Sequence, residues 1–321
     1  MTTVDTRAGA STVRVIVIVL AVLALPLAGA LALLRSVTQV AVSRDTADPA
    51  EVLLRADEVS LTSSDGVRLA AWSIRGRAGA PPIVLVHDLG GSRSDLLNAA
   101  VILNRAGYPL LLLDLRRHGG SEAAMTTLGA KERLDVLAAV RYVRERPGAG
   151  AGRVGGWGVG MGAYALAAAA LEAPELHALA LDSLYADVAT AADRLLAGGL
   201  PPPLGVLVPV LRPLYDPFFR CRLGEVALSR RIQALAGRDL LIIAPSESPD
   251  LLKDARRLYE AVPEVADGGR SLLVLRRTGL SGLYAEDRTR YDQAIVDFFG
   301  GALPAEAAGA PATGPIRVIE R

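Results

Sequence analysis

The stretch VGGWGVGMGAYALAAAALEA, Val154–Ala173, decides how this chain folds. Its first residues are apolar and few enough for a strand, and its last are mostly alanine, the strongest helix former. Glycine adopts positive φ at no steric cost, so Gly158, Gly160 and Gly162 let the chain pass sharply from strand to helix. A strand that leads directly into a helix indicates an α/β protein.

Outward from this stretch, short apolar runs alternate with segments of helical periodicity. Continuous apolar strands are typical of a sheet covered on both faces, and their alternation with helices predicts parallel strands. Near the start, Ser64-Asp65-Gly66 separates two alternating runs and predicts a hairpin of Glu58–Ser63 with Val67–Ile74. The later strands are expected at Pro82–His87, Pro109–Leu115, Gly152–Trp157, His177–Leu181, Leu240–Ala244 and Ser271–Arg276. The helices are expected at about Ser94–Ala106, Lys131–Glu145, Met161–Glu172, Asp187–Ala197, Asp250–Ala261 and Ala285–Phe299.

The composition excludes several classes of function. A net charge of +1 over 321 residues gives no electrostatic basis for binding nucleic acid. Cys221 is the single cysteine, so the chain cannot form an internal disulfide. Cysteine and histidine do not occur at the spacing of metal ligands, so neither a metal nor another cofactor is expected.

The N-terminal region carries an apolar run over 15–35 that is long enough to cross a bilayer as a helix, which takes about 20 residues. We therefore expect a tail over 1–14, a transmembrane anchor over 15–35 and a linker over 36–56. A cleaved signal peptide ending at Ala28-Gly29-Ala30 is the main alternative, and a buried core helix is a third option. The numbers of arginines on the two sides of this run are equal, so the positive-inside rule gives no orientation. The short basic tail favours a single-pass protein of the cell membrane with its domain outside the cytoplasm.

The folded domain is expected over 57–300, with a disordered tail rich in alanine, proline and glycine over 301–321. Within the domain, residues 199–219 interrupt the alternation of strands and helices. This apolar, proline-rich segment predicts a small lid inserted between two strands. It is either a loop packed on the core or a cap over a pocket, in contact with the membrane.

Several motifs occur in an order that resembles the α/β-hydrolase superfamily, in particular small bacterial membrane-anchored serine hydrolases of the esterase and peptidase-like kind. His87–Ser92 resembles the oxyanion loop H-G-x-x-G, and Asp114–Ser121 resembles the turn D-x-R-G-H-G-x-S. Ser64–Trp72 resembles the opening hairpin, Asp182–Asp187 the segment after the following strand, and Gly158–Gly162 the nucleophile elbow G-x-S-x-G. The resemblance implies a mostly parallel central sheet with helices on both faces and a small lid.

The catalytic positions depart from this pattern, because an active member needs serine, then aspartate or glutamate, then histidine. Gly160 stands at the serine position, Ser248 at the acid position and Leu280 at the histidine position. Glu247 and Asp250 lie within two residues of the acid position. The chain has no histidine after His177, so the turn after the last strand cannot supply a base. No catalytic residue is therefore expected at the triad positions.

The remaining histidines have structural explanations. The resemblance implies that His87 and His118 shape their loops and form hydrogen bonds, while His177 begins a strand.

The oxyanion hole can survive the loss of the triad. The resemblance places its backbone donors at Leu89 and Met161, with Asp88, Gly158 and Gly162 beside them as candidate ligand-binding residues. These residues favour a pseudohydrolase that binds a small acyl or apolar ligand, or a protein partner, near the membrane.

Two other functions stay open. A hydrolase with an unconventional site would use Asp88 together with Glu247, Ser248 and Ser281, although Asp88 is also placed to cap the turn leading to Ser94. The residues Gly158-x-Gly160-x-x-Ala163 also match a dinucleotide fingerprint, with Asp182 where a ribose-binding acid would lie.

Overall fold

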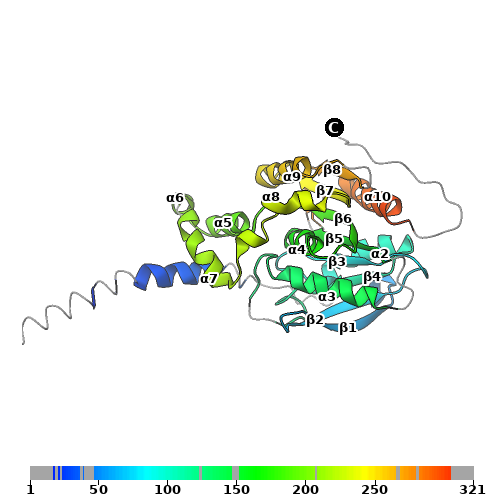
Figure 1. Ribbon diagram of the computed structural model, residues 1–321, viewed down its shortest axis with the longest axis horizontal. Coiled ribbons are helices and arrows are strands. Elements are labelled where there is room, and N and C mark those ends of the chain that lie inside the picture. Colours follow the sequence, from blue (N-terminus) through cyan, green and yellow to red (C-terminus); the bar gives the residue numbers. More distant parts are fainter. Residues whose placement is uncertain are drawn as a thin grey trace, which may run out of the picture.

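An eight-stranded sheet runs through the centre of the computed structural model, in the order β1-β2-β4-β3-β5-β6-β7-β8 (Figure 1). The structure describes residues 17–18, 21, 24–36, 39, 47–122, 125–146, 152–206, 208–264, 268–279 and 282–304. The pairs β1–β2 and β2–β4 are antiparallel, and the other pairs are parallel. The mostly parallel sheet and the opening hairpin are therefore confirmed.

The observed elements lie close to the segments of apolar and helical periodicity. The strands are β1 Ala56–Thr62, β2 Arg68–Ile74, β3 Ile83–Val86, β4 Leu110–Leu113, β5 Val154–Val159, β6 Leu176–Asp182, β7 Asp239–Pro245 and β8 Arg270–Leu275. The helices are α2 Leu97–Arg105, α3 Glu132–Arg144, α4 Met161–Ala170, α5 Val188–Gly198, α6 Pro202–Gly205, α7 Tyr215–Phe219, α8 Leu228–Arg231, α9 Pro249–Ala261 and α10 Ala285–Ala302. Short 3₁₀ turns are η1 Pro49–Val52, η2 Arg93–Leu96, η3 Val208–Leu214, η4 Leu223–Glu225 and η5 Ile232–Leu235.

Side chains along the strands alternate between two apolar clusters, one on each face of the sheet. In β3, Ile83 and Leu85 belong to the cluster that contains α2 and α10. Val84 and Val86 belong to the cluster that contains α3, α4 and α9. Because successive strand residues point to opposite faces, a continuous apolar run is what a doubly covered sheet requires.

Helix α4 lies in the middle of this second face, and all ten of its residues are buried. Its alanines bring it close to β5, where Gly156 has no room for a side chain, since a Cβ there would lie 2.6 Å from Leu166. A helix that is apolar all round belongs in a core. The turn between β5 and α4 is consequently held firmly on both sides.

A helical insertion lies between β6 and β7, and the predicted lid over 199–219 forms its outer part. This segment contains α6, η3 and α7. Tyr215 and Phe219 of α7 are buried in the main core, whereas Val206 and Val210 are 76% and 73% exposed. The segment is thus anchored by aromatic side chains and exposes apolar ones.

The predicted anchor over 15–35 lies partly outside the described residues. Residues 24–36 are helical, and Leu34 is buried in the cluster that includes α7. Among the described residues, no helix combines the length and apolarity needed to cross a membrane. The anchor therefore stays a prediction. At the other end, α10 runs to Ala302, and the predicted tail from 305 onward lies outside the described residues.

Candidate functional site

The turn at Gly160 has the strained geometry of an elbow. Gly160 has φ +52° and ψ −112° and immediately precedes α4. Its N–H donates to the Asp182 carbonyl at 2.9 Å, and its carbonyl accepts from Tyr164 N at 3.1 Å. These bonds fix the turn at the carboxyl end of β5, next to the end of β6. The chain therefore turns sharply from β5 into α4 at Gly160, with no side chain at the apex.

The two outer glycines of the elbow permit close packing of backbone against backbone. A Cβ at Gly162 would lie 2.5 Å from the carbonyl oxygens of Val86 and His87. A Cβ at Gly158 would lie 2.8 Å from Gly162. The sequence predicts both as candidate ligand-binding residues; both are buried, and the structure assigns them to the packing of α4 against β3 and β5.

The oxyanion donors do converge, and a side chain of the protein occupies the place between them. Asp88 Oδ1 accepts from Leu89 N and from Met161 N, both at 2.7 Å. A carboxylate oxygen at this position stands where the carbonyl oxygen of an acyl substrate would lie. Asp88 thus supplies both donors with an acceptor from within the chain.

This arrangement corrects the interpretation of Asp88 as a cap for the following turn. The N–H groups at that turn use other carboxylates: Asp95 Oδ2 accepts from Ser92 N at 2.9 Å, and Asp114 Oδ1 accepts from Arg93 N at 2.7 Å. Asp114 opens the motif Asp114–Ser121, whereas Asp95 lies outside the quoted motifs. Asp88 is free of capping and turns to the elbow instead.

Gly160 and Asp88 depend on each other sterically. A Cβ on Gly160 would overlap the Asp88 carboxylate, including Oδ1. Any residue larger than glycine at position 160, serine included, therefore requires Asp88 to leave the hole. The present position of the Asp88 carboxylate is therefore compatible only with glycine at position 160.

Solvent still reaches the Asp88 side chain. The protein around the carboxyl raises its pKa above the usual range by desolvation, and the nearby Asp182 carboxylate acts in the same direction. The two N–H donors oppose this shift, because they favour the ionised form. Asp88 is consequently an exposed residue whose carboxyl group has a raised pKa and accepts from two backbone N–H groups.

Asp182 is a residue of this site that the triad motifs do not identify. It is fully buried at the end of β6, and its Oδ2 accepts from Tyr291 OH at 2.7 Å and from Gly279 N at 2.9 Å. Its Oδ1 accepts from Ser183 Oγ at 2.9 Å. Burial raises the pKa of Asp182. This carboxylate reaches Gly279 in the turn that follows β8, the turn expected to carry the histidine.

The same bonds argue against the dinucleotide interpretation. A ribose-binding acid must present free oxygens to the sugar hydroxyls. Both oxygens of Asp182 already accept hydrogen bonds inside the protein. The amides at the start of α4, which would face a pyrophosphate, include Met161 N, and this amide is bound to Asp88.

The predicted acid position does not bring a carboxylate to the elbow. Ser248 precedes α9, and the neighbouring Glu247 lies on the surface, where it pairs with Arg277 at 2.7 Å and accepts from Tyr284 OH at 3.0 Å. Asp250 lies 3.7 Å from Arg194. Leu280, at the histidine position, and Ser281 lie outside the described residues.

Two buried histidines hold the loops below the elbow. His87 Nε2 accepts from Leu115 N at 3.1 Å, and His118 Nε2 accepts from Gly90 N at 3.0 Å. The two rings lie 5.0 Å apart. Burial lowers the pKa of His87 to about 3 and also lowers that of His118. Both act as neutral acceptors that join the oxyanion loop to the next loop, as the resemblance implies.

A buried ion cluster supports the same region. The Arg116 guanidinium pairs with Asp135 and with Asp65, each at 2.7 Å, and both Arg116 and Asp135 are buried. Burial raises the pKa of Asp135 to about 7. Arg116 thereby ties the hairpin turn, the loop after β4 and α3 together.

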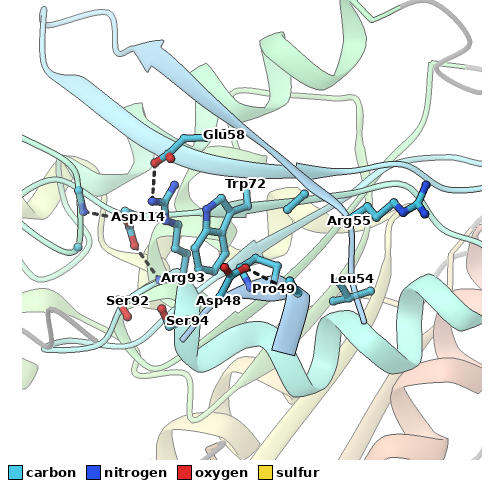
Figure 2. Close-up of a pocket in the computed structure, with 14 residues that line it drawn as sticks. Asp48, Pro49, Leu54, Arg55, Glu58, Trp72, Ser92, Arg93, Ser94 and Asp114 are labelled. Carbon is cyan, nitrogen blue, oxygen red and sulfur yellow. Dashed lines mark hydrogen bonds and ion pairs between the residues drawn. The ribbon is translucent and has the colours of Figure 1, made fainter. Parts of the chain in front are cut away.

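Two cavities lie near these loops, and neither is lined by Gly160, Asp88 or Met161. The first, of about 760 Å³, lies between the hairpin and η2. In Figure 2, Arg93 stands beside the Trp72 ring, 4.3 Å from its centroid, and reaches Glu58 and Asp114. The second, of about 710 Å³, lies under α7.

Comparison with protein families gives one match over about half of the chain. Residues 49–204 match the model described as X-Pro dipeptidyl-peptidase (S15 family). A curated relative, the thiohydrolase aneE of Aspergillus aculeatus, is 30% identical over 119 residues, which are 36% of this chain. The matched part spans 37% of the length of that relative.

Solved structures resemble nearly the whole folded part. The Pyrococcus furiosus esterase Pf2001 superposes with a TM-score of 0.63 at 20% identity, over 82% of this chain and 98% of the esterase. The α/β hydrolase GrgF of Penicillium sp. sh18 gives a TM-score of 0.62 at 16% identity, over 78% of this chain and 99% of that protein. The chain therefore has the α/β-hydrolase fold.

Proposed function

We propose that this chain is a pseudohydrolase, an α/β-hydrolase-fold protein that does not perform acyl transfer at its elbow. One observation carries the proposal: a single oxygen of Asp88 accepts from both oxyanion donors, at 2.7 Å each. Acyl transfer needs these donors for the negative charge that develops on the substrate oxygen. Here that position already holds an oxygen of the protein, and Gly160 offers no nucleophile.

The loss extends to the other catalytic roles. A serine hydroxyl is activated by a histidine that removes its proton, and the acid orients that histidine. Both described histidines near the site are buried and hydrogen-bonded to backbone N–H groups, so neither can accept a proton from a substrate. The chain then binds a small acyl or apolar ligand, or a protein partner, and does not convert it.

The comparisons favour a second candidate function, a hydrolase of esters or thioesters. The proteins similar to this chain include an esterase and a thiohydrolase. In addition, solvent reaches the Asp88 carboxyl, and the pKa of this group is raised. In this alternative Asp88 would leave the hole and act as a base for water. The same carboxylate cannot fill the hole and activate water at once, and this is the reason that we place the alternative second.

A paired assay separates the two functions. Purified full-length chain is mixed with short-chain aryl esters and aryl thioesters, and in parallel with a fluorophosphonate probe. We expect neither turnover above the buffer rate nor labelling. Asp88→Asn is the matched control, since an asparagine oxygen can accept the same two N–H bonds. Turnover by the natural chain that Asp88→Asn abolishes would establish the hydrolase.

We also propose that residues 15–35 hold the chain in the cell membrane with its domain on the extracytoplasmic side. The length and apolarity of this run support the proposal. Protease added to intact cells and then to lysed cells tests the orientation. Digestion of the domain only after lysis would contradict it.

A further inference from the structure

The cavity of about 710 Å³ under α7 is a second place where the chain could hold a ligand. It lies where four parts of the chain meet: residues 24–36, the hairpin turn, the start of α3 and α7. Figure 1 shows residues 24–36, in blue, beside α7 at the end of the molecule that carries α5 and α6. Its size is within the range of sites for small organic ligands, about 300–1,000 Å³.

The walls of this cavity are mainly apolar. They are formed by the side chains of Leu31, Val67, Met125, Leu214, Pro217, Phe218 and Phe219. Of these lining residues, Phe219 is buried and Leu31 is 40% exposed. Such a lining favours an alkyl chain over a polar metabolite, because burying alkyl groups gains free energy in proportion to their area.

Three cations and one carboxylate line the cavity: Arg116, Lys131, Arg220 and Asp65. Arg116 pairs with both Asp65 and Asp135, and its hydrogen bond to Asp65 lowers the pKa of Asp65 to about 2. Lys131 and Arg220 also line the cavity. Neither forms a hydrogen bond or ion pair through its side chain within the described part of the chain. Two cations are thus available to an anionic group next to an apolar wall.

Apolar surface continues outward from the same end of the molecule. Leu25 in residues 24–36 is 73% exposed, as are Val206 at 76% and Val210 at 73% beyond α6. Leu25 lies within the run over 15–35 that we expect in the bilayer, so this exposed apolar surface is a route by which a lipid could pass from the membrane to the cavity.

From these features we infer that the cavity binds an anionic amphiphile: an alkyl chain packed against Met125, Leu214 and Phe218, with a carboxylate or phosphate head held by Lys131 and Arg220. The inference rests on the proposed function and deepens it, since it names a ligand for a fold whose elbow is closed. The site is separate from the elbow, because neither Gly160 nor Asp88 lines this cavity.

Photo-crosslinking tests the inference on the full-length chain in lipid nanodiscs. The probe is palmitate with a diazirine on its alkyl chain, and mass spectrometry maps the attached residues. We expect labelling within 125–131 and 214–220, suppressed by excess palmitate and by hexadecyl phosphate. Inorganic phosphate and hexadecanol should compete far more weakly, because each lacks one half of the ligand. Labelling confined to 15–35, or equal competition by hexadecanol, would overturn the inference.

Charge variants provide the second arm. Lys131→Gln and Arg220→Asn should each reduce labelling about fivefold, as expected for a partly exposed ion pair. Asparagine suits position 220, where φ is +50°. Lys253→Gln is the matched control, since Lys253 is the other lysine of the chain and lies exposed on α9. Equal labelling of all three variants and the natural chain would also overturn the inference.

The two proposals fail in different experiments. Ester turnover that depends on Asp88 would refute the proposal of a pseudohydrolase, but it would leave the labelling at 125–131 and 214–220 unaffected. Absence of that labelling in a chain without turnover would refute the proposed amphiphile site, whereas the proposal of a pseudohydrolase would stand.

Discussion

The elbow at Gly160 and the loops beneath it lie at the same edge of the sheet, yet their polar side chains serve different ends. Below the elbow, His87, His118 and Asp114 accept hydrogen bonds from backbone N–H groups of neighbouring loops. At the elbow, Asp88 accepts from the two N–H groups that an acyl substrate would need.

This contrast separates what the fold requires for itself from what catalysis requires. A buried N–H without an acceptor costs free energy, so the side chains that satisfy loop backbone must stay for the loops to keep their shape. A serine, its base and its acid satisfy no such need. The N–H groups of Leu89 and Met161 do need an acceptor, and Asp88 provides one.

The largest effect is expected below the elbow, at the buried ion cluster. Arg116→Met removes the cation between Asp65 and Asp135 and leaves Asp135 buried without its partner. We expect a loss of about 3–5 kcal/mol in the free energy of unfolding, measured by urea denaturation. The double variant Arg116→Met/Asp135→Leu should recover much of this loss. If the single variant is as stable as the natural chain, the loops do not depend on this cluster.

A smaller effect is expected at the elbow itself. Gly160→Ser places a Cβ on the Asp88 carboxylate and a side chain at φ +52°. We expect a loss of about 2–3 kcal/mol from the positive φ and the displaced carboxylate together, and no esterase activity. Adding Asp88→Gly should restore part of the stability. The control Gly198→Ala meets no atom within 4 Å and should have little effect.

The smallest effect depends on pH and concerns His87. Its folded pKa, about 3, lies below the ordinary value of 6.5, so the neutral ring contributes stability above pH 6.5 that is lost as the pH falls toward 3. His87→Leu should cost about 1–2 kcal/mol at pH 7.5, because leucine leaves Leu115 N without an acceptor. The difference between the two proteins should shrink on acidification. A constant difference from pH 7.5 to pH 4 would show that His87 is not buried as a neutral ring.

The fold can be predicted from the sequence because its signal is repeated along the chain. Each buried strand is a short apolar run, and β5 to α4 is marked by glycine and alanine, so Val154–Val159 and Met161–Ala170 lie near their expected places. The motifs predict that the N–H groups of Leu89 and Met161 face one point, and in the structure both donate to Asp88 Oδ1.

The contents of the site cannot be predicted in the same way. A carboxylate near a turn can cap the turn or point away from it. The rotamer of Asp88 depends on the space that Gly160 leaves by having no side chain. Asp182 carries no signal of its role, because its partners, Gly279 and Tyr291, are about a hundred residues away in the sequence. No local pattern contains such information.

The proposed closure of the oxyanion hole depends on the bond between Asp88 and the amide of Met161, and selective isotope labelling observes that bond directly. The chain has three methionines, so ¹⁵N-methionine labelling gives few amide signals. We predict that the Met161 amide shifts with pH as Asp88 titrates, at a pKa above the ordinary 3.8, and that Asp88→Asn abolishes this titration. A Met161 amide that exchanges freely with solvent and does not respond to Asp88→Asn would contradict the closed oxyanion hole.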